Sequence, residues 1–164
     1  MPVVIRKAGK QDAALLSSLN ADVQAVHAAA MPWLFKPPGP DTFSRSDIAE
    51  IVEREDAFLF VAEIDGVAAG YVYAEIIRRP ETAFHFANDA VHVHHISVRP
   101  AHRRTGIGGA LLAAVRDAAA ANSVALLSAD VWTFNDAARA FFRRNGFLAC
   151  SERLWTSEKA IRSD

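Results

Sequence analysis

The sequence predicts an α/β fold in which a mixed β-sheet carries helices on both faces. The main observation is the order of its apolar segments, whose strand-like and helix-like spacings follow one another as β-α-α-β-β-β-α-β-α-β. The second is size: 164 residues, 51% of them hydrophobic, are enough for one sizeable core but short for two domains. The third is that the sequence contains no repeat, low-complexity tract or linker. We therefore expect a single domain spanning residues 1–164.

The first half of the chain predicts two helices between its strands. A short strand at residues 2–8, PVVIRKA, precedes a segment at 10–30 whose leucines and valines recur at helical spacing. Four prolines among residues 31–40 indicate a loop, and a second helix is expected within residues 42–56. Residues 57–77 then predict a hairpin, because two apolar runs meet at an Asp-Gly turn.

The second half predicts three more strands with a helix after each of the first two. The strand AVHVHHISV at residues 90–98 leads to a glycine-rich turn and an alanine-rich helix that ends near Asn122. A buried strand is expected at 123–132, and a helix from 135 to 146 with Asn135 as its N-cap and Gly146 at its end. The segment FLACSERLW at 147–155 predicts a final strand, with Cys150 in the core.

The stretch HRRTGIGGALLAAV at residues 102–115 lies between a predicted strand and a predicted helix. Its glycines let backbone N–H groups approach a ligand closely, and the helix adds the positive end of its dipole, so the turn suits phosphate or pyrophosphate. A nucleotide-binding P-loop would require a lysine, which this stretch lacks. A dinucleotide-binding fingerprint would require Gly-x-Gly-x-x-Gly after the first strand, and neither spacing nor position fits.

The pattern Arg103-x-x-Gly106-x-Gly108, preceded by ISVRP, resembles the pyrophosphate-binding motif of the GCN5-related N-acetyltransferases (GNAT). A second block, ADVWTFNDAARAFFRRNGF at 129–147, looks like the strand–Asn–helix–Gly-Phe segment of the same family. The resemblance extends over residues 57–155, while the first 50 residues match only in their strand–helix–helix plan. It implies a mixed, mostly antiparallel sheet of about six to seven strands, splayed between the fourth and fifth.

The resemblance also implies acetyl-CoA as cosubstrate. The backbone of residues 96–98 would pair with the pantetheine arm, the N–H groups of 104–109 would surround the pyrophosphate, and an asparagine would contact the cofactor near pantetheine. Phe142 stands seven residues after this asparagine, where many members carry the tyrosine that protonates the leaving thiolate. The residues assigned in this way to cofactor binding are Ile96, Ser97, Val98, Arg103, Arg104, Thr105, Gly106, Ile107, Gly108, Gly109, Asn135 and Phe142.

Acetylation of an amine requires a base, and three residues are candidates for this catalytic role. Asp130 lies five residues before Asn135, where related ribosomal-protein acetyltransferases carry a glutamate. His94 and His95 lie on the strand where other members carry a glutamate, and histidine accepts a proton near neutral pH. Strand alternation predicts that the two histidines point to opposite faces, with His95 toward the acetyl group. Each of the three also has an ordinary structural interpretation.

A metal site is the alternative use of the histidine strand. His92 and His94 share a face two positions apart, but two ligands do not make a zinc site. The sequence offers no cysteine nearby, so we expect no metal. The loop at 31–40, with Trp33 and Phe35, is expected either to wall the acceptor site or to cover the core.

The overall charge gives little direction toward macromolecular partners. A formal net charge of −1 argues against nucleic acid and anionic membranes, and one cysteine favours a reducing cytoplasm. We therefore expect an N-acetyltransferase that acts directly on a primary amine of a small molecule or a protein N-terminus. The resemblance to the family also suggests a homodimer. The alternative is a domain that binds acyl-CoA as a sensor or interaction module without transferring the acetyl group.

Overall fold

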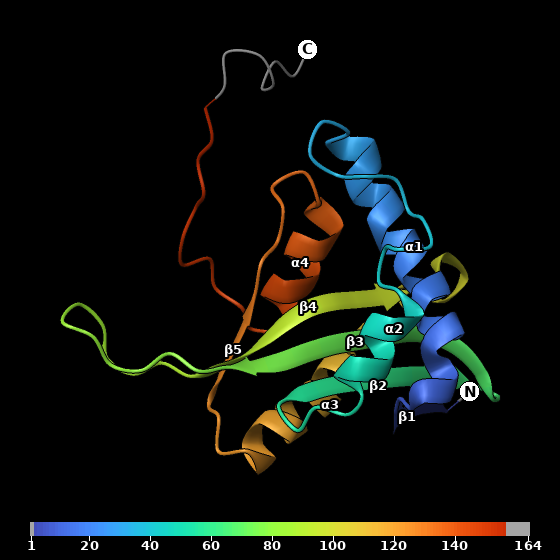
Figure 1. Cartoon of the computed structure of the whole chain (residues 1–164), viewed down its shortest axis with the longest axis horizontal. Helices are drawn as coiled ribbons and strands as arrows, with labels where there is room; N and C mark the ends of the chain where they lie inside the picture. Colours follow the sequence, from blue (N-terminus) through green and yellow to red (C-terminus); the bar gives the residue numbers. More distant parts are fainter. Residues whose placement is uncertain (1, 157–164) are drawn as a thin grey trace.

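A computed structural model describes residues 2–156. Within them, five strands form one sheet in sequence order: β1 (Val3–Lys7), β2 (Ala57–Ile64), β3 (Val67–Ile77), β4 (Ala90–Val98) and β5 (Leu126–Ala129). Neighbouring strands are antiparallel except β4 and β5, which run parallel (Figure 1). The α/β class and the mixed, mostly antiparallel sheet are therefore confirmed.

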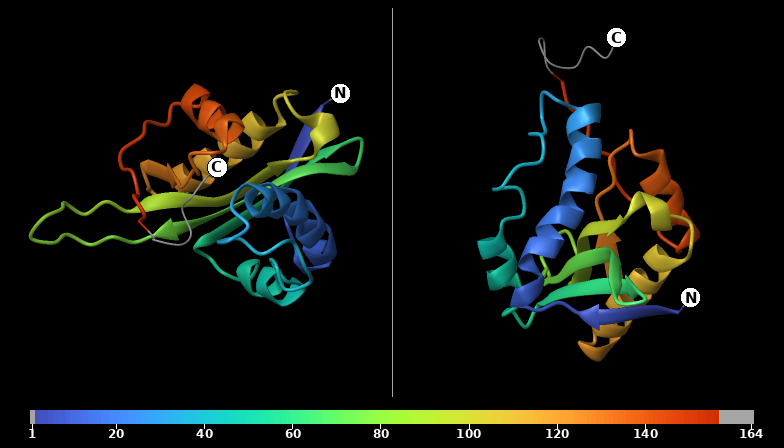
Figure 2. Two further views of the ribbon diagram at one scale, coloured as in Figure 1. Left: turned by 90° about the horizontal axis from the view of Figure 1, so that it is seen from above. Right: turned by 90° about the vertical axis from the view of Figure 1, so that its right-hand side faces the viewer.

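The helices cover both faces of the sheet. Those of the first half are α1 (Ala13–Ala30) and α2 (Arg45–Ile51), and those of the second half are α3 (Ile107–Ala121) and α4 (Asp136–Arg144). Figure 2 shows α1 and α2 on one face and α3 and α4 on the other. In the described residues, no helix is both long and apolar enough to span a bilayer.

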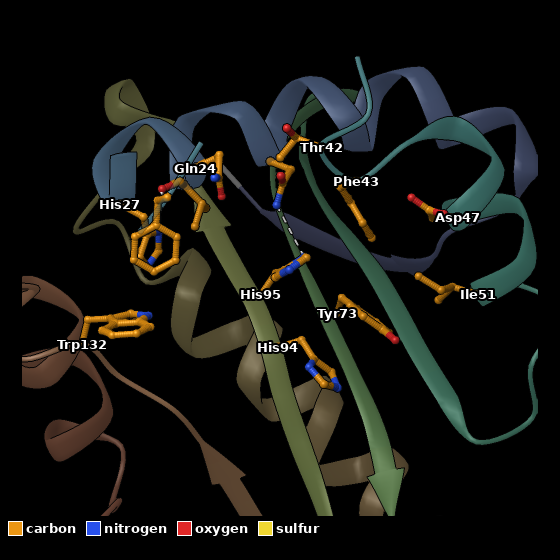
Figure 3. A pocket seen from close by; sticks show the side chains of 13 residues that line it. Gln24, His27, Thr42, Phe43, Asp47, Ile51, Tyr73, His94, His95 and Trp132 are labelled. Atoms are coloured by element: carbon orange, nitrogen blue, oxygen red, sulfur yellow. Dashed lines mark hydrogen bonds between the residues drawn. The ribbon is translucent and has the colours of Figure 1, made fainter. Parts of the chain in front are cut away.

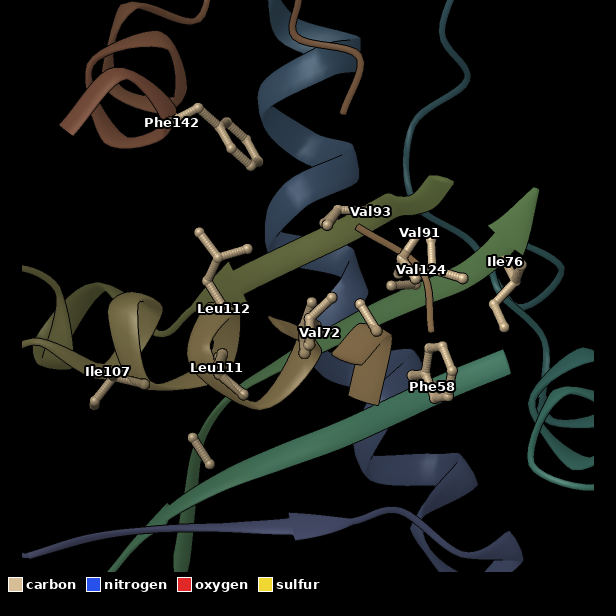
Figure 4. Close-up of a cluster of buried hydrophobic side chains, with 14 of the residues drawn as sticks. Phe58, Val72, Ile76, Val91, Val93, Ile107, Leu111, Leu112, Val124 and Phe142 are labelled. Atoms are coloured by element: carbon tan, nitrogen blue, oxygen red, sulfur yellow. The ribbon is translucent and has the colours of Figure 1, made fainter. Parts of the chain in front are cut away.

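Both faces of the central strands are buried, which explains their nearly continuous apolar sequences. Along β2, Phe58 and Ala62 point to the cluster under α3, whereas Leu59 and Val61 point to the cluster under α1. The α3 cluster, shown in Figure 4, also contains residues of β3, β4 and α4. The sheet is therefore the middle layer of three.

The number of strands is smaller than expected, because residues 147–155 form no strand. Leu148 is 89% and Leu154 is 83% exposed, and Cys150 is also exposed instead of lying in the core. The segment leaves the sheet because its aromatic ends find other partners: the Phe147 ring centroid lies 5.0 Å from that of Phe142, and the Trp155 ring lies 5.8 Å from Trp33.

The pairing of β4 with β5 is short. It runs from Ala90 opposite Leu126 to Val93 opposite Ala129, where β5 ends. The expected strand at 123–132 is thus shortened, because Trp132 packs edge-on against Phe35 at 5.0 Å. Strand β4 continues to Val98 without β5 beside it, which leaves a gap where the resemblance places the splay.

A β-bulge interrupts β4 at its second half. Tyr73 pairs with His95 and Ala74 with Val93, so that His94 is an extra residue without a direct partner on β3. An extra residue changes the alternation of side chains along the strand. The expectation that His94 and His95 point to opposite faces is therefore wrong: both line one cavity on the α1 side of the sheet.

Candidate functional site

A cavity of about 420 Å³ lies between α1, α2, the strands β3 and β4, and the chain that follows β5. Rings line much of it, as Figure 3 shows, and His94 and His95 form its floor on β4. From the loop after α1, Phe35 also lines the cavity, whereas Trp33 is 45% exposed and contacts Trp155. Of the two aromatic residues in the 31–40 loop, Phe35 is the one that walls the cavity.

His94 forms a hydrogen-bonded pair with a carboxylate. Its Nε2 lies 2.8 Å from Oε1 of Glu75, which also receives the guanidinium of Arg54 at 2.7 Å and the Tyr73 hydroxyl at 3.1 Å. Burial alone would raise the pKa of Glu75, but the hydrogen bonds from Arg54 and His94 outweigh it, and the net pKa is lowered. An ionised Glu75 accepts a proton-bearing Nε2, which leaves the lone pair of His94 on Nδ1.

The imidazole of His95 lies deeper, among the rings of Phe43 at 4.9 Å and Tyr73 at 5.6 Å. Its Nδ1 lies 3.5 Å from the Asn20 amide nitrogen, which also donates to the Tyr71 hydroxyl at 2.8 Å. Burial, helped by the positive charges of nearby histidines, lowers the pKa of His95 to about 4. The ring is therefore neutral at pH 7 but a weak base.

Asp130 lies just after β5 and is open to solvent. Its carboxylate is 94% exposed and lies 3.9 Å from Nε2 of His92. The other ring nitrogen of His92 is 2.9 Å from the Ser128 hydroxyl, and its ring meets that of His94 edge-on at 4.8 Å. Burial, followed by the charge of His94, lowers the pKa of His92. The structure thus connects Asp130 to His94 only through His92.

No three metal-binding side chains come together anywhere in residues 2–156. The histidines of β4 instead bond to Ser128, Glu75 and Asn20. One ring nitrogen of each of these histidines therefore serves a hydrogen bond within the protein.

The glycine-rich turn presents a run of free backbone donors. Arg104 and Gly106 adopt positive φ angles of 63° and 91°, and α3 begins at Ile107. In the described part of the chain, the N–H groups of residues 104–109 donate to no protein acceptor, and the next one, Ala110, closes the helix by bonding to Gly106. Successive unpaired N–H groups at a helix start form an anion-binding cradle.

The side chains around this turn are occupied by the protein itself. Ile96 and Val98 pack on the α3 cluster, and the Ser97 hydroxyl donates to the Leu19 carbonyl at 3.4 Å. Arg103 Nε donates to the Val98 carbonyl at 3.1 Å, and Thr105 donates to the His102 carbonyl at 2.6 Å. What these residues leave for a ligand is mainly their backbone.

Helix α4 packs directly on the glycine turn. A Cβ at Gly108 would lie only 2.9 Å from the Phe141 ring, whereas one at Gly109 would meet nothing within 4 Å. Phe142 is 7% exposed and belongs to the α3 cluster, so it holds the core together. Asn135 caps α4 by accepting from the Ala138 N–H at 3.0 Å, as its sequence position predicts.

Comparison with known families identifies this arrangement. The model described as the acetyltransferase (GNAT) family matches residues 22–147. The chain belongs to the GNAT acetyltransferase family. Membership assigns acetyl-CoA as cosubstrate, and the cradle at 104–109 together with the gap beside β4 fits a long ligand that carries phosphate and amide groups.

Solved GNAT-like structures share this fold at low sequence identity. A tetramutant of the BH1408 protein of Bacillus halodurans is 21% identical with a TM-score of 0.88, covering 94% of this chain and 99% of that one. The aminoglycoside N-acetyltransferase AAC(6')-Iy in complex with CoA is 21% identical with a TM-score of 0.76, covering 96% and 95%. A ribosomal-protein-alanine N-acetyltransferase of Brucella melitensis is 23% identical with a TM-score of 0.70, covering 96% and 99%. A search among curated proteins gives no match.

The sequence alone did not predict three residues that form hydrogen bonds in or beside the cavity: Glu75, Arg54 and Asn20. A signal existed for the first, since Glu75 is the only charged residue in the strand VAAGYVYAEII. The register places it opposite His92, next to the histidines of β4. Asn20 and Arg54 are polar residues in helix and loop segments of ordinary composition. Only the folded chain brings Asn20 into the cavity lining and Arg54 to Glu75.

Proposed function

We propose that the protein transfers acetyl from acetyl-CoA directly to a primary amine bound in the cavity, with His94 as general base. The ammonium first gives one proton to His94 Nδ1. The free amine then forms a bond to the thioester carbonyl carbon, and the nitrogen loses its second proton to solvent. The carbon–sulfur bond then breaks, and the thiolate of CoA leaves with the electron pair. The observation that carries this proposal is the hydrogen bond of 2.8 Å between His94, on the cavity floor, and Glu75 beside the cavity.

The pair supports the choice of His94 because a carboxylate on one ring nitrogen fixes the tautomer and stabilises the charged ring. His95 is the weaker candidate, since its pKa of about 4 gives it little affinity for the proton of an ammonium. Asp130 is the weaker candidate for a different reason: it is 94% exposed and is not among the residues that line the cavity.

The donor would lie with its pyrophosphate on the N–H groups of residues 104–109 and its amide-bearing arm along β4. Six unpaired donors at a helix start favour a dianionic group there. The edge of β4 at residues 96–98, which β5 leaves unpaired and where, among the described residues, the Val98 carbonyl alone has a partner in Arg103, favours an arm that hydrogen bonds as an added strand. Asn135 uses its side-chain oxygen in the α4 cap, so its amide nitrogen is the atom that remains for a ligand.

Direct transfer is favoured over an acyl-enzyme because the cavity wall contains no cysteine or serine. Cys150 is exposed on the segment after α4. A chain that binds acyl-CoA without transfer is the second candidate, and Phe142 favours it: no hydroxyl at this position protonates the leaving thiolate.

The two candidates are separated by measuring acetyl-CoA binding by calorimetry and acetylation of a panel of primary amines by mass spectrometry. We expect acetyl-CoA to bind with a Kd in the micromolar range. We also expect a product about 42 Da heavier than the amine, because an acetyl group replaces one hydrogen. Tight binding without any acetylated amine would overturn the transferase and leave the sensor.

The cradle is tested with Gly109→Glu, which adds bulk and negative charge where the protein leaves space. We expect at least a tenfold loss in acetyl-CoA affinity at unchanged thermal stability. Gly39→Glu is the matched control, because Gly39 also has open space around it but lies in the loop before α2. Equal affinity of the Gly109→Glu variant and the unaltered protein would refute the assignment of the turn.

A further inference from the structure

We infer that the acceptor is an arylalkyl primary amine: one ammonium group on a short chain that ends in a flat aromatic ring. This inference rests on the proposed function and specifies its acceptor. It follows from two properties of the cavity, namely the rings that form its walls and the shortage of free negative charge.

One wall is a group of contacting rings contributed by separate parts of the chain. Phe35 meets Trp132 at 5.0 Å and 88°, and meets His27 of α1 at 5.0 Å. Trp132 in turn stacks on Phe134 at 6.2 Å and 16°. Rings held by other rings keep their orientation, so this wall presents a fixed aromatic surface.

The opposite wall is formed by rings from β3, β4 and the loop before α2. Phe43 stacks on Tyr73 at 6.0 Å and 24°, and its edge meets His95 at 4.9 Å and 87°. Figure 3 shows Trp132 and His27 on one side of the cavity and Phe43 and Tyr73 on the other, with His94 between them on the floor. A flat ring between the two walls would make aromatic contacts on both sides.

The charges around the cavity suit a single ammonium group. Asp47 is the one acidic residue among the lining residues, and its Oδ2 already accepts from the Ser44 N–H at 3.0 Å and the Ser44 hydroxyl at 2.7 Å. Glu75, beside the cavity, is occupied by Arg54 and His94. A polyamine or aminoglycoside would therefore bring further ammonium groups to a wall whose one carboxylate without a cationic partner is that of Asp47, at a high desolvation penalty.

The reacting amine itself needs no carboxylate of its own. Ring faces attract a cation, and the Trp132 ring is part of the lining. His94 lies on the floor between the two walls, so an amine at the foot of either wall lies next to the proposed base. The walls thus place the aromatic end of the acceptor and the floor places its nitrogen.

The test compares kcat/KM for 2-phenylethylamine, n-propylamine and spermidine with saturating acetyl-CoA. We expect 2-phenylethylamine to exceed each of the other two by about 30-fold, which corresponds to about 2 kcal/mol of ring burial. Equal or greater kcat/KM for n-propylamine or spermidine would overturn the inference, although the proposed transferase would stand.

Two variants locate the selectivity. Phe35→Leu and Trp132→Leu keep apolar bulk but remove a ring, and each should lower the phenylethylamine-to-propylamine ratio at least fivefold. Phe84→Leu is the control, since Phe84 is 91% exposed in the arm that joins β3 to β4 and projects from the body (Figure 1). An unchanged ratio in both ring variants would contradict the assignment of the walls.

A binding measurement separates the failure of this inference from the failure of the proposed function. Calorimetry with 2-phenylethylamine and with n-propylamine, both in the presence of CoA, needs no turnover. Ring-selective binding without acetylation would overturn the transferase but support the acceptor site as an arylalkylamine site. Binding without ring preference would overturn the inference whether or not acetyl transfer occurs.

Discussion

The α3 face of the sheet buries only hydrocarbon, in a cluster of Phe, Ala, Val, Ile and Leu side chains, whereas the α1 face also buries polar groups. The buried polar residues of the described chain are Asp12, Asn20 and Ser97, and all three lie on α1 or at its ends or donate to it. The cavity opens on this second face. The contrast indicates that the α3 layer supplies most of the apolar packing and the α1 layer the acceptor cavity, while the cradle for the cofactor lies at the start of α3.

The polar face is held together by specific partners. Asn20 donates to Tyr71, and Asp12 receives the Arg6 guanidinium in two hydrogen bonds of 2.8 Å each. Because buried polar atoms are costly unless they are bonded, these pairs keep the face rigid where the cavity interrupts the packing. Substitutions on the two faces should therefore act on different properties.

The largest expected effect on stability is on the α3 face. Leu112 is 1% exposed, and Leu112→Ala should lower the free energy of unfolding by about 3 kcal/mol, from lost burial and the cavity that remains. Urea unfolding measures this loss. Transfer at 15 °C should stay within about threefold of the unaltered protein. If activity fell while stability did not, the division between the faces would be wrong.

On the polar face, Asn20→Ala should cost about 2 kcal/mol, because it leaves the buried Tyr71 hydroxyl without its partner. Tyr71→Phe is the matched change, and in the double variant the two losses should be less than additive by about 1 kcal/mol. A double-mutant cycle in urea measures this coupling. Additive losses would show that the hydrogen bond contributes nothing.

The pH dependence of stability should also distinguish the cavity face. The pKa of His95 is about 4 in the folded protein and near 6.5 when unfolded, chiefly because of burial. Between these two pH values the unfolded chain binds more protons than the folded protein. The stability that depends on a neutral, buried His95 is therefore complete above pH 6.5 and is lost as the pH falls to about 4. The slope should reach about 1.4 kcal/mol per pH unit.

His95→Gln should remove this part of the slope while keeping a hydrogen-bonding group beside Asn20. Urea midpoints at half-unit intervals from pH 7 to pH 4 measure the difference between the two proteins. His85→Gln is the control, because His85 lies in the exposed arm. An unchanged slope in His95→Gln would mean that this ring is accessible to protons in the folded state.

The smallest expected effect compares two adjacent glycines at the start of α3. Gly109→Ala should raise the stability by about 0.5 kcal/mol through helix propensity, since its Cβ meets nothing. The Gly108→Ala variant should be about 1 kcal/mol less stable than the Gly109→Ala variant, because the new Cβ displaces the Phe141 ring. Thermal unfolding of the pair measures the difference, and equal midpoints would contradict the close packing of α4 on this turn.

Much of the fold follows from the sequence because its signals are local. Apolar spacing located the first helix of the first half, and the Asp-Gly turn located the hairpin of β2 and β3. The strand at 90–98 was predicted with its correct bounds. The strand expected at 147–155 failed because its composition suits either a strand or an aromatic contact, and Trp155 found its partners in Trp33 and Trp132.

The site was harder to predict because it depends on one inserted residue. Regular alternation sends His94 and His95 to opposite faces, and only the bulge opposite Tyr73 and Ala74 brings both to the cavity. The environment of Glu75 was equally hard to predict, because its partners His94 and Arg54 are distant from it in the sequence. The glycine-rich turn before α3, in contrast, was predictable because its residues lie in one continuous stretch.

The central claim is that His94, paired with Glu75, is the base. It is tested most directly by kcat for His94→Gln and His95→Gln, with acetyl-CoA and the best amine of the panel. His94→Gln should lower kcat at least about 100-fold, with the acetyl-CoA affinity within about twofold. His95→Gln should lower kcat by less than about tenfold. A kcat for His94→Gln equal to that of the unaltered protein, or a larger loss in His95→Gln, would contradict the account.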